Sequence, residues 1–497
     1  MSTMDKNIDA DQRAESFPYN CSSIIIGKNA STTGKVILAH NEDDRDVVNQ
    51  QHIVPRIKHA PDETIIFEDG TAVIPQVSET YEYYWSEMRS SKEKVAAADG
   101  FVNEWGVAIY SDSCISCKEE ASDPQPAGML YALRRLVAER SRTAREGVEV
   151  AIGLIEKYGY NGARSYQICD QNEAWVLQVA KGKHYAAKRV PDDEVLYIPN
   201  WYTIHKIDFA DTEHKNYYFA SDLVSYAIKH GWYTPANEGD YSDFDFAKAY
   251  QGEGENQFNI LRARNAWRIL LGKEPTDIKQ FSAKLDKKIG AQDAKRVMRS
   301  HYEGTADDMT CDYDLNPHMN PMRHFTICNA WTVESSIIEF NETPALTCIW
   351  RAALTPCISP YVPWYLGMTK IPYGYNWCGP LEAQKTHFCP PVSDDQYHID
   401  RAFWTFMTVK YLTDFDYKGT HETLQASVRE LEANWSQAQA NVEAEYHDKL
   451  KNDPAAARQF ITEYTAAQAK RVWDLASSMI QRLGEAKVSS NKKNPAK

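Results

Sequence analysis

The chain has 497 residues, with 55 Lys and Arg against 69 Asp and Glu, which gives a formal net charge of −14. This acidic balance argues against broad binding to nucleic acid or to anionic membranes, because both require clustered basic residues. Hydrophobic residues make up 43% and charged residues 25%, which is typical of a globular protein and excludes the disordered, collagen and coiled-coil classes. The sequence contains no apolar run of the roughly 18 residues that a membrane span requires.

The first twenty residues mix acids, bases and amides and lack the apolar segment of a secretory signal. We therefore expect residues 1–20 to be unstructured and the chain to be cytoplasmic. In a reducing cytoplasm its ten scattered cysteines are expected to remain thiols.

Order is expected to begin at Cys21, where the β-rich run CSSIIIGKNA starts. A turn that ends at Gly34 leads into a second predicted strand, Lys35–Ala39, so the two strands form a hairpin. The ionisable cluster His40-Asn41-Glu42-Asp43 follows directly. Antiparallel pairing of the two strands would therefore bring this cluster back towards Cys21.

The rest of the body alternates strands and helices without the pattern of a parallel sheet. After a strand at Gly106–Tyr110 come two amphipathic helices, and Thr143 with Glu146 forms the capping box of the second. The further predicted strands are Ser165–Cys169, Ala174–Ala180, His184–Val190, Phe325–Ile327, Ser335–Phe340 and Ala345–Trp350. Hairpins and a meander in place of βαβ crossovers indicate antiparallel sheets flanked by helices, an α+β layered fold.

From about residue 416 the composition shifts to Ala, Glu, Gln and Lys, and the strand pattern ends. Pro454 suits the first position of a second long helix. That helix has an apolar stripe predicted to end at Gly484, followed by a frayed polar end over Lys487–Lys497. The stripe is expected to pack on the body or to form a subunit contact in a homo-oligomer.

Cys21 is the strongest candidate for chemistry. If residues 1–20 are removed, its thiolate can attack a carbonyl while its own α-amine, with a pKa of about 8, acts as the general base. The alternative is a buried core cysteine. The abrupt start of a strand at Cys21 and the ionisable cluster at the end of the paired strand favour the nucleophile.

The motifs around these residues resemble one enzyme family in order along the chain. They run from Cys21-x5-Gly27-Lys28 and Asn41-Glu42-Asp43 through Asn103-Glu104-x-Gly106, Glu139-Arg140-x2-Thr143, Glu173-Ala174-Trp175-Val176, His301-Tyr302-Glu303-Gly304-Thr305 and Tyr361-Val362-Pro363-Trp364-Tyr365. The chain is similar to the dipeptidase A/secernin family of cysteine N-terminal-nucleophile (Ntn) hydrolases. This family is distantly related to penicillin V acylase and bile salt hydrolase.

The resemblance implies an αββα four-layer sandwich over residues 21–415, a helical extension over 416–497 and a propeptide over 1–20 that is removed by autoproteolysis. It implies hydrolysis of dipeptides with Cys21 as nucleophile and no metal or organic cofactor. Asp43 matches the acid that holds the free amine, and Asn200 the oxyanion-hole asparagine, with a backbone N–H near Tyr110–Ser111 as second donor. Arg262 matches the arginine near the thiolate, with Arg264 as the alternative register.

His40 departs from the family pattern, because relatives more often carry Arg or Lys immediately before Asn-x-Asp. A histidine has an ordinary pKa of about 6.5 and is mostly neutral at pH 7. We therefore expect activity to depend on His40 protonation unless Arg262 supplies the positive field.

Other motifs are interpreted as structural. Cys114-x-x-Cys117 lacks a second ligand pair, and His301-Tyr302-Glu303 lacks the histidine pair of a zinc helix, so no metal site is predicted. Two rival functions stay open. One is an Ntn amidase or acylase acting on acylated amino acids, and the other is a non-enzymatic, secernin-like interaction protein with unprocessed Cys21.

Overall fold

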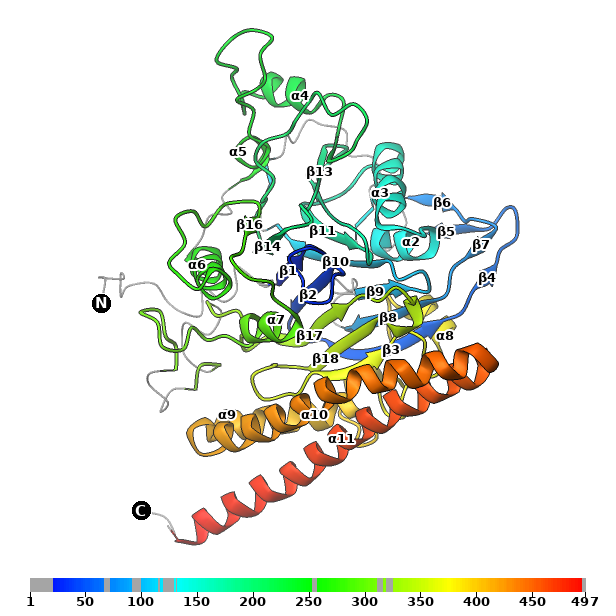
Figure 1. The fold of residues 1–497 in the computed structure, drawn as a ribbon, viewed down its shortest axis with the longest axis vertical. Helices are drawn as coiled ribbons and strands as arrows, with labels where there is room; N and C mark the ends of the chain where they lie inside the picture. The colour runs from blue at the N-terminus through cyan, green and yellow to red at the C-terminus, as the bar shows by residue number, and fades with distance from the viewer. Residues whose placement is uncertain are drawn as a thin grey trace.

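The computed structural model describes residues 21–66, 72–91, 100–114, 117–118, 129–130, 132–252, 257–310, 316–318 and 325–493, with the side chains of 485–493 left aside. The predicted leader, residues 1–20, lies outside this range. In the described part the chain forms two large antiparallel sheets, helices on their outer faces and a long helical pair at the C-terminal end (Figure 1).

The first sheet has seven strands and contains the strand that Cys21 precedes. Its order is β16 (Ala283–Lys284), β14 (Glu194–Ile198), β1 (Ser22–Ile26), β2 (Ile37–Asp43), β17 (Thr332–Glu339), β18 (Cys348–Ala353) and β19 (Val362–Tyr365). The predicted hairpin is confirmed, since β1 pairs antiparallel with β2 and Ser23 lies opposite His40. The second strand is longer than predicted, because it continues through the ionisable cluster to Asp43.

The second sheet has eight strands. Its order is β15 (Tyr217–Phe219), β13 (Tyr185–Arg189), β12 (Ala174–Val179), β11 (Arg164–Cys169), β10 (Ala108–Ser113), β9 (Gly100–Asn103), β8 (Tyr83–Arg89) and β3 (Val48–Val54). The predicted meander is confirmed as β11–β12–β13. Two small ribbons extend from this sheet, β4 (Ile57–Lys58) with β7 (Glu79–Thr80) and β5 (Thr64–Ile66) with β6 (Val73–Pro75).

Helices cover the outer face of each sheet, so the predicted αββα sandwich is confirmed. On the eight-stranded sheet lie α2 (Ala132–Arg140) and α3 (Ala144–Tyr158), and on the seven-stranded sheet lie α6 (Gln257–Leu271) and α7 (Ala291–Met298). The inner faces meet through buried side chains, including the Ser23–Asp112 hydrogen bond between β1 and β10. The shorter elements are α4 (Leu223–Lys229), α5 (Phe246–Tyr250), α8 (Pro380–Thr386) and the 3₁₀ turns Pro344–Leu346 and Val392–Asp395.

Local sequence signals explain several of these boundaries. Thr143 caps α3 as predicted, accepting a hydrogen bond from the backbone N–H of Glu146. Gly27 ends β1 against a neighbouring loop, and a Cβ at this position would lie 2.5 Å from the carbonyl oxygen of Asp192. Only glycine allows that approach, so the glycine of the first motif is needed for packing.

The C-terminal region consists of α9 (Ala402–Phe415), α10 (Tyr417–Asn452) and α11 (Pro454–Lys493), which lie along the lower side of the molecule in Figure 1. The break at Asp453-Pro454 is confirmed. The stripe on α11 packs on the body, since its residues Val472, Ala476 and Met479 belong to the buried core. Nearer the start of α11, the Thr465 hydroxyl accepts from the backbone N–H of Tyr365 in β19. The predicted end at Gly484 is wrong, because α11 continues to Lys493 through the segment predicted to fray.

The strand predicted at Gly106–Tyr110 is β10 (Ala108–Ser113), which begins and ends later, and two further predicted strands also differ from the structure. Phe325–Ile327 is not a strand, because its carbonyl groups bond side chains: Phe325 accepts from the Tyr302 hydroxyl and Ile327 from the Asn41 amide. The strand predicted at Ala345–Trp350 begins only at Cys348, after a 3₁₀ turn. Among the described residues, no helix combines the length and apolar character needed to cross a membrane.

Candidate active site

Cys21 directly precedes β1, an inner strand of the seven-stranded sheet, and is 2% exposed. The β1–β2 register places Ser22 opposite Asn41 and therefore aligns Cys21 with Glu42. Alternate side chains of a strand point to opposite faces, so Cys21 and Ser23 share the face that meets the second sheet. Ser22 lies on the other face, below α6.

On the inner face, hydrogen bonds join Cys21 to a chain of ionisable groups. The Cys21 thiol donates to Glu42 Oε1 at 3.0 Å, and Glu42 Oε2 lies 3.0 Å from His40 Nε2. The other ring nitrogen, Nδ1, lies 2.9 Å from Ser23 Oγ, which donates to Asp112 Oδ2 at 2.7 Å. This chain connects the thiol to the second sheet.

The partners of His40 assign its protonation state. The single hydroxyl proton of Ser23 goes to Asp112, so Ser23 accepts from His40 Nδ1–H. Nε2 faces a carboxylate oxygen of Glu42 and donates there as well. Burial lowers the pKa of His40, but the Glu42 hydrogen bond and the charges of nearby carboxylates, Asp112 first, outweigh it, and the net shift is upward. Both ring nitrogens therefore face acceptors, an arrangement that favours the imidazolium form of His40.

The hydrogen bonds and charges around Cys21 do not lower the pKa of its thiol. Burial raises its pKa well above the ordinary value, and the charges of Glu42, Asp112 and Asp43 raise it further. A backbone hydrogen bond from Asp43 acts in the opposite direction but does not outweigh them. The sulfur therefore remains protonated while the Cys21 nitrogen is part of a peptide bond.

Arg262 forms hydrogen bonds on the outer face of the sheet, at the start of β1. It lies on α6, is fully buried, and contacts Cys21 through the backbone, since Nη1 donates to the Cys21 carbonyl at 2.8 Å. Nη2 donates to Asn200 Oδ1 at 2.6 Å and to Asn259 Oδ1. The alternative register, Arg264, is more exposed and pairs with Asp307 at 3.5 Å, away from these groups.

Asn200 follows β14, the strand that pairs with β1 on the side opposite β2. Its side-chain amide Nδ2 donates to the Ser113 carbonyl at 2.8 Å, while Oδ1 accepts from Arg262. The arginine thereby fixes the orientation of the amide. An NH₂ group carries two protons, so one donor remains beyond the Ser113 bond.

Asp43 ends β2 and is fully buried. Its carboxyl oxygens accept from Thr332 Oγ1 at 2.6 Å and from Asn329 Nδ2 at 2.5 Å. Burial raises the pKa of Asp43 from 3.8 to about 7, although the bond from Thr332 and the charge of Arg262 act in the opposite direction. Asp112 shifts the same way, to about 6.

Asn41, between His40 and Glu42 in the sequence, has a structural role. Asn41 Nδ2 donates to the carbonyls of Met298 and Ile327, at 2.9 and 3.0 Å, and its Oδ1 accepts from Ser335. One amide thus joins the end of α7, the loop before β17 and β17 itself.

The structure brings all five residues predicted for the site, Cys21, His40, Asp43, Asn200 and Arg262, into one connected neighbourhood. Sequence reasoning placed Glu42 in the cluster but gave it no role, and it missed Asp112, Asn259 and Asn329. Asn259 had a detectable signal, because it lies one helical turn before Arg262 in the motif Phe258-Asn259-x-x-Arg262 and so shares its face.

Two groups of described side chains have donor atoms close enough together to hold a metal ion. One is Cys21, His40 and Asp112, whose atoms lie within 4.8 Å of one another. There both histidine nitrogens already bond protein groups, Ser23 and Glu42. The other group, His301, His318, Cys328 and Cys357, lies outside this hydrogen-bond chain. The pair Cys114 and Cys117 is in neither group.

The layered fold places a buried cysteine at the head of an inner strand, and comparison with known families identifies the class of protein as a peptidase. The family model described as Peptidase family C69 matches residues 20–430, a span that contains both large sheets. The chain therefore belongs to peptidase family C69, and the resemblance seen in the motifs is confirmed.

Similar proteins of known sequence are named as dipeptidases. A probable dipeptidase of Latilactobacillus sakei is 27% identical over 300 residues, which cover 58% of this chain and 62% of the relative, less than two thirds of its length. A probable dipeptidase B of Streptococcus pyogenes serotype M3 is 23% identical over 503 residues, covering 96% of this chain and 95% of the relative.

Solved structures with detectable likeness include penicillin V acylase from Agrobacterium tumefaciens, with 12% identity and a TM-score of 0.33 over 67% of this chain and 82% of that one. A mutant conjugated bile acid hydrolase from Clostridium perfringens has 11% identity and a TM-score of 0.29, covering 67% of this chain and 89% of the other.

Proposed function

We propose that this chain is a cysteine dipeptidase that hydrolyses the peptide bond of dipeptides through an acyl-enzyme on Cys21, after removal of residues 1–20. The observation that carries the proposal is the position of Cys21, which precedes an inner strand and is bonded to Glu42 on one side and Arg262 on the other. Family membership and the names of the relatives support the peptidase activity.

Removal of the leader supplies the base that the intact chain lacks. A new α-amine at Cys21 would have a pKa of about 8 and take the thiol proton, directly or through a water. The thiolate then attacks the peptide carbonyl of the substrate. The protonated amine gives its proton to the leaving amino acid, and water hydrolyses the thioester, which restores the thiol.

The remaining groups have roles that their contacts support. The free N–H of the Asn200 amide would donate to the tetrahedral oxyanion, with Arg262 keeping that amide in place. Asp43 would hold the new amine, for which a buried carboxyl at the end of β2 is a suitable partner. His40 would provide the cation that favours a thiolate at Cys21.

The decisive experiment combines intact-mass analysis with a substrate panel. Purified protein is expected to have the mass of residues 21–497 and to cleave dipeptides, while N-acylated amino acids and longer peptides are cleaved slowly or not at all. Cleavage of acyl amides without dipeptide turnover would favour the amidase alternative. A mass of residues 1–497 together with no hydrolysis would favour the interaction protein, and either result would refute the proposal.

Replacing His40 with arginine is expected to extend activity to higher pH. The pKa of His40 is raised, so in the natural enzyme the cation is present at low pH and is lost as the pH rises through that pKa. Arginine keeps its charge over the whole range. The measurement is kcat/KM against pH for processed enzyme.

The control is His40→Gln, which carries no charge and is expected to have low activity at every pH. If the basic limb of His40→Arg coincides with that of the natural enzyme, His40 protonation does not control the reaction.

A further inference from the structure

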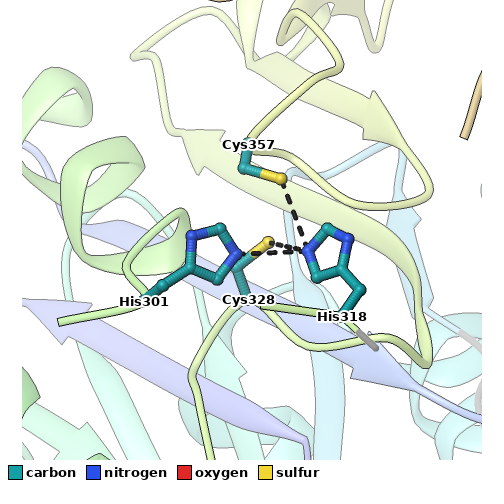
Figure 2. A group of neighbouring side chains, drawn as sticks. All are labelled: His301, His318, Cys328 and Cys357. Carbon is teal, nitrogen blue, oxygen red and sulfur yellow. Dashed lines mark hydrogen bonds between the residues drawn. The ribbon is translucent and has the colours of Figure 1, made fainter. Parts of the chain in front are cut away.

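Four buried side chains from distant segments of the chain lie close together beside the seven-stranded sheet. They are His301 after α7, His318, Cys328 before β17 and Cys357 between β18 and β19, and each is at most 2% exposed. In Figure 2 their sulfur and ring nitrogen atoms are directed towards a common centre. All four donor atoms lie within 4.8 Å of one another.

The spacing of these atoms matches a tetrahedral metal site. Zinc–nitrogen bonds of about 2.0–2.1 Å and zinc–sulfur bonds of about 2.3 Å place two ligand nitrogens about 3.3 Å apart and a nitrogen and a sulfur about 3.6 Å apart. Here His301 Nε2 and His318 Nε2 are 3.2 Å apart. His318 Nε2 lies 3.6 Å from Cys357 Sγ and 3.9 Å from Cys328 Sγ.

The outer hydrogen bonds of the two histidines are a second, independent observation. His301 Nδ1 lies 3.1 Å from Glu303 Oε1, and His318 Nδ1 lies 3.1 Å from Asp414 Oδ1 on α9. A carboxylate only accepts, so it holds a ring proton on Nδ1 and leaves Nε2 as the nitrogen that can bind a metal ion. Carboxylates hold metal-binding histidines in this way.

Two Nε2 lone pairs at this distance repel unless a cation or a shared proton lies between them. Two buried thiols beside them provide the remaining donors of a Cys₂His₂ set, and two thiolates balance the charge of a divalent ion. Four protein ligands leave no position for water, which is the arrangement of structural rather than catalytic zinc.

We propose that His301, His318, Cys328 and Cys357 bind a structural zinc ion. The ion would fix the segment behind the active site, because Ile327 accepts from Asn41 and Asn329 donates to Asp43, on either side of Cys328. It would also tie this segment to α9 through Asp414. This inference does not depend on the proposed peptidase mechanism.

The test is the metal content of the full chain produced in zinc-supplemented medium. Mass spectrometry of the metal is expected to find about one zinc ion per chain, as a closed four-ligand site requires. The double variant Cys328→Ser, Cys357→Ser is expected to contain only background zinc and to melt at a lower temperature. Cys348→Ser, which alters a buried cysteine in β18 outside the group, is the matched control and is expected to keep its zinc.

Two further measurements cover the case in which the double variant does not fold. Cobalt added to zinc-stripped natural protein is expected to give the charge-transfer and d–d absorption bands of a tetrahedral thiolate site. Asp414→Asn keeps all four ligands and is expected to bind zinc about 10–100-fold more weakly in a chelator competition. Absence of zinc combined with absence of the cobalt–thiolate bands, or a Cys328–Cys357 disulfide in protein isolated without reductant, would overturn the proposal.

Discussion

Replacing Cys21 with alanine is expected to lower dipeptide hydrolysis by about 10⁴-fold or more, because loss of a nucleophile removes the covalent route and leaves only binding and oxyanion stabilisation. The same change is expected to leave residues 1–20 attached, because the family resemblance implies autoproteolysis and we propose that the Cys21 thiol starts that cleavage. The fold should persist, because alanine fits the space of a buried cysteine and the lost thiol donates only to Glu42. The measurements are kcat/KM, intact mass and thermal melting.

Two companion variants separate chemistry from folding. Cys169→Ala removes a buried thiol from β11, far along the chain from the site, and is expected to be processed and active. Cys21→Ser retains a weaker nucleophile and is expected to be processed slowly, so that precursor accumulates. Activity of Cys21→Ala close to that of the natural protein would eliminate the covalent mechanism.

Replacing Arg262 with leucine is expected to lower the free energy of unfolding by about 3–5 kcal/mol, the usual result of removing one member of a buried charged network. The side chain of Arg262 has no exposure, and one of its bonds holds the backbone carbonyl of Cys21, the proposed nucleophile. Its loss leaves four acceptors without this donor: Cys21 O, Ser22 Oγ, Asn200 Oδ1 and Asn259 Oδ1. Chemical denaturation measures the loss, and kcat is expected to fall with it because Asn200 is no longer oriented.

Arg264→Leu is the matched control on the same helix. Its side chain is 36% exposed and pairs with Asp307 at 3.5 Å, so its removal is expected to cost about 1 kcal/mol or less. If the two variants have equal stability and equal activity, Arg262 does not organise the site. A folded and stable Arg262→Leu variant with unchanged kcat would likewise show that Arg262 does not organise the site.

The sequence predicts those parts of the fold whose signals are local. The hairpin from Cys21 follows from an apolar run, a turn and a second apolar run, and α3 follows from its cap at Thr143. Phe325–Ile327 has strand-like composition but no strand partner, because the Tyr302 hydroxyl and the Asn41 amide satisfy its carbonyls from distant parts of the chain. Such partners have no local signature. The helical segment beyond Gly484 escapes prediction for a different reason, because glycine weakens a helix without always ending it.

Only those residues of the candidate site that lie in recognisable sequence motifs can be predicted from the sequence. Cys21 and the ionisable cluster that ends at Asp43 are found from the hairpin, whereas the roles of Asp43, Asn200 and Arg262 required the family resemblance. Asp112 comes from the second sheet and Asn329 from the loop before β17, so only the folded structure brings them to the site. The Cys₂His₂ group was missed because its members are separated by 10 or more residues, unlike the short ligand pairs by which zinc sites are recognised.

Asn41 shows how a residue inside a catalytic motif can be constrained for another reason. Its amide satisfies two carbonyls and receives a hydroxyl, and no other amino acid has two donors and an acceptor at that length. Aspartate would lose the donors, and glutamine is longer by one methylene. Evolution is therefore expected to keep asparagine at this position even in descendants that have lost peptidase activity. An intact Asn41 therefore reports the packing of this fold, and the proposed peptidase activity has to be tested at Cys21 rather than inferred from the Asn-x-Asp motif.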